Sequence, residues 1–196
     1  MTNDVKKALE LMKLFPDLQE RGKDGEASLE YSGKPDKDGN VFFSATLDYD
    51  PEKGMVFIDY YKAVRVLQEP ATQGDPEAQF GLAAIFLDAP GSIHNPEMAV
   101  AWLLKVAATG HASAQFRLGD CFASGTGVAQ NFARAVKFYK KSAAQNHSGG
   151  QFGLGICYAN GTGVKQNLKT AKLWLEKSAA QGNDFAKHNL EMLGAT

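Results

Sequence analysis

The chain has 196 residues, enough for one substantial core or for a core with a small appended unit. Its 44% hydrophobic and 22% charged residues are typical of a soluble globular protein, and no apolar run approaches the roughly 18 residues that a membrane span needs. The net charge of −1 divides into −5 over residues 1–60 and +4 over residues 61–196. This division suggests two parts with different surfaces, and neither part is charged enough to indicate nucleic-acid binding.

The first 58 residues predict a small α+β unit. The N-terminal stretch "MTNDVKKALELMKLFPDL" is amphipathic and lacks the features of a secretory signal, so we expect a cytoplasmic protein. Strict alternation in "VFFSATLDY" (41–49), between strand-like "SLEYS" (28–32) and "MVFI" (55–58), predicts a three-stranded antiparallel meander. This unit either caps the rest of the chain or contributes to binding.

A period of 36 residues runs through the remainder of the chain. The motif "AQFGL" begins at Ala78, "AQFRL" at Ala114, "GQFGL" at Gly150 and a degenerate "AKHNL" at Ala186. Segments 114–149 and 150–185 are identical at 18 of 36 positions without a gap. Such a period is typical of a solenoid built from one repeated unit.

Each repeated unit is predicted to form two helices. In one unit, Ala114, Leu118 and Phe122 recur at helical spacing in the first helix. A second apolar stripe begins after Asn131, which stands where that helix needs an N-cap.

The stretches "ASGTGVAQN" (123–131) and "ANGTGVKQN" (159–167) are either phosphate-binding loops or joints between the two helices. A phosphate loop would need a third glycine or a GK[ST] ending, ideally after a strand. Neither ending is present, so we interpret both stretches as joints in which Gly125 or Gly127 closes the first helix. In the preceding unit "DAPGSIHN" (88–95) replaces the joint, and we expect a different loop there between the same helix pair.

The predicted fold is therefore mainly α: an α/α solenoid of helix-turn-helix repeats with a small N-terminal α+β cap of one helix and a three-stranded antiparallel meander. The predicted divisions are a cap at 1–58 and a solenoid at 59–196, made of a half repeat at 59–74, repeats at 75–110, 111–146 and 147–182, and a C-terminal helix at 183–196.

The unit "AQFRLGDCFASGTGVAQNFARAVKFYKKSAAQN" resembles the Sel-one-like repeat, an α/α solenoid relative of the tetratricopeptide repeat. The resemblance rests on Leu118, Gly119, Gly125, Gly127 and Val128, and in the next unit on Leu154, Gly155, Gly161, Gly163 and Val164. It covers residues 59–196 and implies roles in signalling complexes, trafficking or host–microbe contacts.

Motifs of hydrolases, metalloproteases and nucleotide-binding enzymes are absent from the sequence. His111 and His147 stand 36 residues apart, and we interpret them as solvated turn residues and not as metal ligands. Cys121 and Cys157 have the same spacing and are predicted to be free and buried. The aromatic series Trp102, Phe138 and Trp174 is predicted to be core. We expect no catalytic activity, no cofactor and no metal.

In solenoids of this kind the first helix of each pair lines the concave side. The stripe of these helices that is predicted to be exposed varies between units, as a partner-binding surface would. Its residues are Glu77, Gly81, Ala84, Asp88, Ser113, Arg117, Asp120, Ser124, Gly153, Ile156 and Asn160. An alternative for Arg117 and Asp120 is that they simply pair with each other at i, i+3.

The leading hypothesis is a non-catalytic protein–protein interaction scaffold or adaptor that binds a peptide or protein partner in the concave groove, and neither nucleic acid nor membrane. A second hypothesis is a bacterial immunity protein that neutralises a cognate toxin, because some immunity proteins resemble this family. A third is a β-lactamase-like hydrolase, as claimed for cysteine-rich relatives. This chain departs from those relatives, since it has one cysteine in each of two units where they have pairs.

Overall fold

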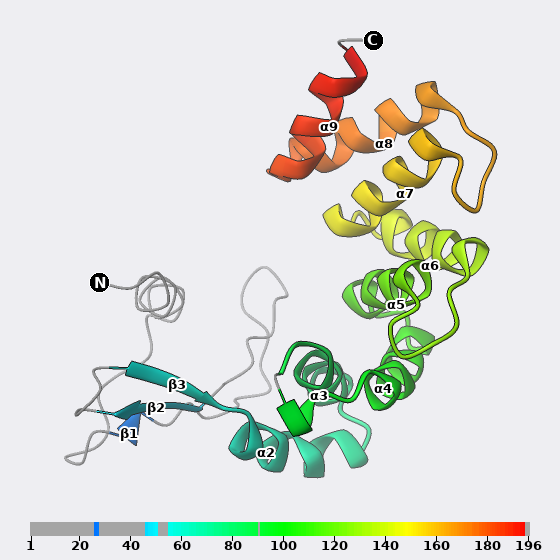
Figure 1. Ribbon diagram of the computed structural model, residues 1–196. Coiled ribbons are helices and arrows are strands. Elements are labelled where there is room, and N and C mark those ends of the chain that lie inside the picture. Colours follow the sequence, from blue (N-terminus) through cyan, green and yellow to red (C-terminus); the bar gives the residue numbers. More distant parts are fainter. Residues whose placement is uncertain (1–25, 28–45, 51–54, 90, 195–196) are drawn as a thin grey trace. The chain divides into compact units, whose positions relative to one another are not determined.

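Pairs of helices, most of them 13 residues long, make up most of the chain in the computed structural model (Figure 1). The structure describes residues 26–27, 46–50, 55–89 and 91–194. The chain divides into two compact units, Met1–Gly81 and Leu82–Thr196.

In the first unit, three strands pair antiparallel in the order β1-β2-β3. Their bounds are Glu26–Ala27 for β1, Thr46–Asp50 for β2 and Met55–Asp59 for β3. Helix α2 (Tyr60–Thr72) follows and buries Ala63, Leu67 and Ala71, which recur at i, i+4 and i+8. The predicted N-terminal helix and the strand over 28–32 lie outside the described residues, so the N-terminal cap remains a prediction.

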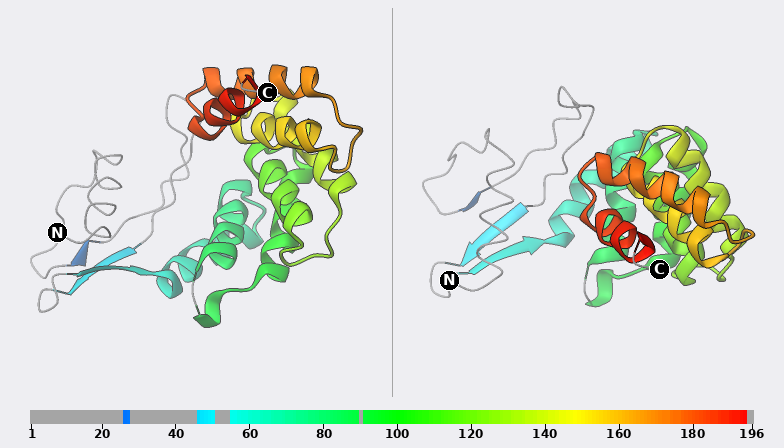
Figure 2. Two further views of the ribbon diagram at one scale, coloured as in Figure 1. Left: turned by 45° about the horizontal axis from the view of Figure 1, so that its top comes forward. Right: turned by 90° about the horizontal axis from the view of Figure 1, so that it is seen from above.

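Helix α3 (Pro76–Asp88) begins in the first unit and ends in the second, where a 3₁₀ helix (Gly91–Ile93) follows it. The remaining α-helices of the described chain are α4 (Pro96–Ala108), α5 (Ala112–Ser124), α6 (Phe132–Ala144), α7 (Ser148–Asn160), α8 (Leu168–Ala180) and α9 (Asp184–Gly194). They stack in chain order (Figures 1 and 2), and each packs on the next. We call α5, α7 and α9 the first helices and α4, α6 and α8 the second helices of their pairs.

The core of the second unit consists of the apolar positions that repeat along the chain. Leu82, Leu118 and Leu154 stand 36 residues apart and are at most 2% exposed. Burial of each such side chain contributes roughly 1.5–3 kcal/mol. The core positions predicted from Ala114, Leu118 and Phe122 are confirmed, and so is a mainly α helical-repeat solenoid.

The joints between helices are built as their sequence predicts. Asn131 accepts a hydrogen bond from the Arg134 backbone N–H, and Asn95 and Asn167 cap α4 and α8 in the same way. Gly125 ends α5 in the left-handed conformation with φ 81°, where glycine carries no steric penalty. In the segment 88–95 the 3₁₀ helix takes the place of the glycine loop, and α4 still begins after Asn95.

The second glycine of each loop lies against the preceding repeat. A Cβ atom added at Gly127 would stand 2.2 Å from the carbonyl oxygen of Pro96, the first residue of α4. One added at Gly163 would stand 2.4 Å from the carbonyl oxygen of Phe132, the first residue of α6. The glycine loop therefore joins repeats as well as helices, and only a residue without a side chain fits there.

Alanine at Gly163 is expected to destabilise the protein far more than alanine at Gly182. Both glycines have positive φ, 71° and 88°, so each substitution costs roughly 1–2 kcal/mol in backbone strain. Only Gly163→Ala also forces a Cβ onto main-chain atoms, since nothing lies within 4 Å of a Cβ at Gly182. Urea unfolding of the two variants measures the difference, and equal midpoints would contradict the close contact.

Candidate functional site

A groove of about 900 Å³ in the second unit is lined mainly by residues of the first helices α5 and α7. Most of its lining is apolar, with one phenylalanine from each first helix: Phe116 on α5, Phe152 on α7 and Phe185 on α9. Its volume falls within the range of roughly 300–1,000 Å³ that is usual for ligand sites.

The aromatic side chains of the groove form two clusters. The ring of Phe116 lies 6.2 Å from that of Tyr139 and 5.3 Å from that of His147, measured between centroids. The rings of Phe152 and Phe185 lie 6.2 Å apart. Phe185 is 75% exposed, which is unusual for a phenylalanine in a folded domain. The rings of Phe116, His147 and Phe152 are partly exposed, and Tyr139 is buried. Apolar surface that stays open beside a groove marks interaction sites.

Tyr139 reaches the groove from α6, a second helix. Its ring passes between Gly119 of α5 and Gly153 of α7, where an added Cβ would stand 2.6 Å and 2.9 Å from the ring. Its hydroxyl donates a hydrogen bond of 2.7 Å to Oδ1 of Asp120. The two glycines therefore provide the space that lets a side chain of the outer helix layer contribute to the groove.

Asp120 and Tyr139 form the polar centre of the groove. Burial raises the pKa of the Asp120 carboxyl, while the Tyr139 hydrogen bond and the Arg117 charge oppose that rise. Burial, and then the neighbouring carboxylate of Asp120, raise the pKa of the Tyr139 phenol well above its usual range. The phenol therefore stays protonated and donates to the carboxylate at neutral pH.

The alternative in which Arg117 pairs with Asp120 is wrong. The Arg117 guanidinium pairs instead with Asp88 at the end of α3, and Asp120 receives the Tyr139 hydroxyl. Asp88 lies on α3 and Tyr139 lies on α6, so the spacing of Arg117 and Asp120 along α5 does not reveal either partner. The ion pair joins residues of adjacent repeats.

His147 and His111 are helix N-caps and not solvated turn residues, which corrects the sequence interpretation. The Nδ1 atom of His147 accepts a hydrogen bond of 3.2 Å from the Gly150 N–H, and His111 does the same for Ala114. Since Nδ1 of His147 is an acceptor, its neutral ring carries the proton on Nε2, which lies 3.3 Å from the Ser113 hydroxyl. Burial, and then the charge of His111, lower the pKa of His147.

A family model for the Sel1 repeat matches residues 76–111, 112–147 and 148–183. The chain belongs to the Sel1 repeat family. Proteins of this family generally act in protein–protein interactions.

Solved structures of Sel1 repeat proteins are similar to this chain. One, from Oxalobacter formigenes, is 33% identical over 60% of this chain and 90% of its own, with a TM-score of 0.58. A protective antigen of uropathogenic Escherichia coli with this repeat fold is 31% identical over 65% of this chain, with a TM-score of 0.62, and the match spans 27% of that antigen. Helicobacter pylori cysteine rich protein B shares the fold at 23% identity, with coverage of 67% and 95% and a TM-score of 0.53. No curated protein sequence matches the chain.

Four of the predicted partner-binding residues line the groove between the Sel1 repeats: Asp120, Gly153, Ile156 and Asn160. The others lie outside its lining: Glu77, Gly81, Ala84, Asp88, Ser113, Arg117 and Ser124. Gly81 was expected on the exposed stripe and is buried, so the helix face inferred from spacing is wrong at that position. The partner-binding role of the remaining residues stays a prediction.

The sequence interpretation missed the aromatic side chains of the groove and His147. One signal could have found two of them, because the third residue of the "AQFGL" motif is phenylalanine in three successive units, at Phe80, Phe116 and Phe152. Phe116 precedes Asp120 by four residues and so shares its helix face. Nothing in the spacing of Tyr139 shows that it points between two helices toward the groove.

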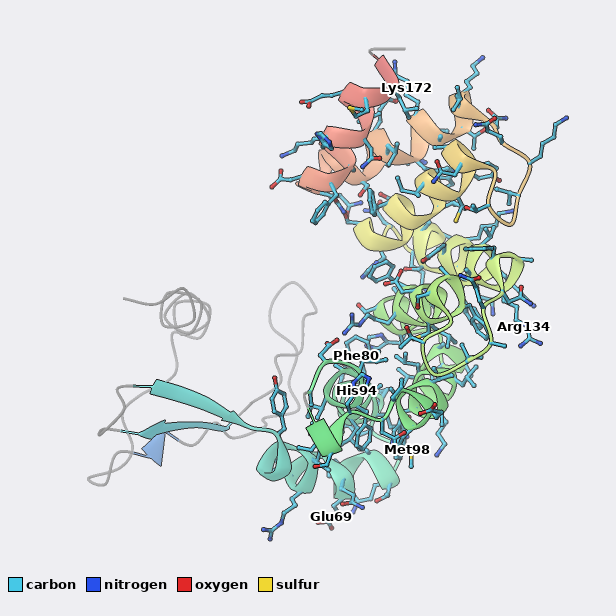
Figure 3. The ribbon with its side chains drawn as sticks, viewed as in Figure 1. Glu69, Phe80, His94, Met98, Arg134 and Lys172 are labelled. Atoms are coloured by element: carbon cyan, nitrogen blue, oxygen red, sulfur yellow. The ribbon has the colours of Figure 1, made fainter. Side chains whose placement is uncertain are left out.

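The aromatic series on the second helices was predicted to lie in the core. The structure shows that Trp102, Phe138 and Trp174 are only half-buried. Lysine ammonium groups lie over its two tryptophans, Lys105 at 4.2 Å from Trp102 and Lys177 at 4.7 Å from Trp174. The spacing of 36 residues shows that the three aromatic residues occupy the same position in each repeat, but that position is partly exposed to solvent. The lysines of the second helices are exposed, and so is Arg134; Figure 3 shows Arg134 and Lys172 pointing away from the ribbon.

Both cysteines are free and buried, as predicted. Burial, and then the Asp120 charge, raise the pKa of Cys121 to about 11, and burial also raises that of Cys157. Neither thiol is therefore a thiolate at neutral pH.

Within the described ranges, no three His, Cys, Asp or Glu side chains gather in a way that could hold a metal ion. None of the described helices is long and apolar enough to span a membrane.

Tyr139→Phe is expected to lower the free energy of unfolding by about 1 kcal/mol, because it removes the hydrogen bond to Asp120. It should also raise the pKa of Asp120, which that hydrogen bond lowers. Urea unfolding and an NMR titration of the carboxyl measure the two effects. Tyr158→Phe on α7 is the matched control, since the Tyr158 hydroxyl makes no hydrogen bond to any of the described residues. An Asp120 pKa that is equal in wild type and Tyr139→Phe would contradict the assignment.

Acid is expected to destabilise the protein through His147. Its pKa is lower in the folded chain, so the unfolded chain binds more protons and the free energy of unfolding falls as pH drops below about 6.5. His147→Asn keeps a capping oxygen that does not titrate, and should flatten this decline between pH 7.5 and pH 5. Thermal melts across this range measure it. The exposed His188→Asn is the control, and an unchanged decline in His147→Asn would refute the prediction.

Proposed function

We propose that this protein is a non-catalytic adaptor that holds a peptide segment of a protein partner in the groove between α5, α7 and α9. The observation that carries the proposal is the pair of Phe152 and Phe185, which leaves a large aromatic surface open beside an apolar groove. Such surfaces are where large side chains of a partner gain most from burial.

The construction of the groove favours an extended segment over a large folded surface. Successive first helices each contribute one phenylalanine, so the apolar positions are spread along the stack of repeats. Polar groups accompany them: the Asn160 side chain, and the side-chain NH₂ of Asn183, whose Oδ1 accepts the Ala186 N–H. Such groups suit the main-chain amides of a peptide.

The groove is preorganised for binding. Tyr139 is held between two glycines and by its hydrogen bond to Asp120, and the His147 cap fixes the start of α7. Rigid walls reduce the entropy that binding must remove, which supports a recognition site. The protonated thiols of Cys121 and Cys157 support the absence of cysteine-based catalysis.

The test compares Phe185→Asp with Met192→Asp. Both residues lie on α9 and are 75% and 61% exposed, but only Phe185 lines the groove. Immobilised wild type and Met192→Asp should capture the same partner from a lysate of the host, while Phe185→Asp retains about a tenth or less of it. Quantitative mass spectrometry measures the captured protein.

Thermal melts of both variants verify that the fold is intact. Overlapping peptides of the captured partner should then compete with it, and one short segment should account for the binding. Equal capture by wild type and Phe185→Asp would place the binding site outside the groove and refute the proposal.

A further inference from the structure

A carboxylate stands among the aromatic walls of the groove. Of the described residues that line it, Asp120 is the only one with an acidic or strongly basic side chain. The nearby His147 caps α7 through Nδ1, and its lowered pKa keeps the ring neutral at neutral pH. The charge of the lining at neutral pH is therefore negative and concentrated at one point.

One oxygen of this carboxylate is open to a ligand. Oδ1 accepts the Tyr139 hydroxyl, and no described residue donates a hydrogen bond to Oδ2. The nearby Arg117 guanidinium is engaged with Asp88. Among the described residues, the only fully buried side-chain polar atom without a partner is Oγ of Ser142, so Oδ2 is not fully buried, and Asp120 is one of the residues that line the groove.

The surroundings of Oδ2 suit a side chain with an apolar stem and a cationic end. Phe116 lies one helical turn away on α5, and Ile156 occupies the position on α7 that corresponds to Asp120, 36 residues later. Lysine and arginine pack their methylene groups on such surfaces, and arginine also stacks on aromatic rings. An acidic ligand would be repelled, and a purely apolar one would bury the carboxylate without a partner.

The charge is confined to one repeat. The positions that correspond to Asp120 in the neighbouring repeats are Ala84 and Ile156. A cation bound at Asp120 would therefore fix the register of a peptide along otherwise similar repeats.

We propose that the ligand of the groove is a peptide segment in which a lysine or arginine stands close to an aromatic or large aliphatic residue. The cation pairs with Oδ2 of Asp120, and the apolar side chain packs against Phe152 and Phe185. This inference rests on the proposed function and names the chemistry of the partner at the same site.

A selection of random dodecamer peptides displayed on phage, with wild-type protein as the target, tests the proposal. The selected peptides should be enriched in a basic residue near a large apolar one. Synthetic copies should bind Asp120→Asn about tenfold or more weakly in fluorescence polarisation. Asparagine still accepts the Tyr139 hydroxyl, so the fold is kept. Glu191→Gln removes the same charge from an exposed site outside the lining and should leave the Kd unchanged.

A double-mutant cycle identifies the pair of charges. Replacement of the basic residue of the peptide by norleucine should weaken binding to wild type by a similar factor. The same replacement should have little further effect on Asp120→Asn, because the interaction is already lost.

The remaining outcomes separate this inference from the function on which it rests. The pairing of a basic residue with Asp120 is overturned if the selected peptides lack a basic residue, or if they bind Asp120→Asn as tightly as wild type. If Phe185→Asp abolishes the binding of those peptides, the groove remains a peptide site. Peptides that bind Phe185→Asp unchanged overturn both proposals. A selection that yields no binding peptide also overturns both proposals. In that case, if wild type sediments as a dimer and Phe185→Asp as a monomer, the groove binds a second copy of the chain.

Discussion

Successive Sel1 repeats approach one another so closely that certain positions have no room for a side chain. Gly163 lies on the carbonyl of Phe132, and Gly119 and Gly153 lie on the two sides of the Tyr139 ring. A Cβ atom at any of these positions would come within 3 Å of another group. Stacking of repeats, and hence burial of their leucine and alanine core, depends on this absence of side chains.

The same close approach creates the groove. Because Tyr139 passes between α5 and α7, its hydroxyl can meet Asp120 on the inner side of the second unit. The hydrogen bond offsets part of the cost of a half-buried carboxylate, so a charged group persists among aromatic rings. Structure and recognition are thus coupled: the glycines that permit stacking also place the polar centre of the site.

Much of the fold could be predicted from patterns in the sequence. The 36-residue period indicates the repeat, the spacing of Leu118 and its apolar neighbours indicates a helix, and Asn131 marks the start of the next one. Each helix and cap depends on a few adjacent residues. The candidate site was predicted less well. Asp120, Gly153, Ile156 and Asn160 were found because a helix face follows from spacing along one helix. Phe185 was missed because its exposure depends on how α9 packs against its neighbours. The alternative that paired Arg117 with Asp120 was wrong because the partner of Arg117 lies on another helix.

The sequence by itself determined the repeat, the helix pairs, the asparagine caps of the second helices and the family, because backbone hydrogen bonding, capping and amphipathic spacing act over one or two helical turns. Only the tertiary structure decided that Arg117 pairs with Asp88 and that Tyr139 and Asp120 meet in a groove. These features join side chains from different helices. Their distances depend on how closely the repeats stack, and that spacing is set by packing and not by any single stretch of sequence.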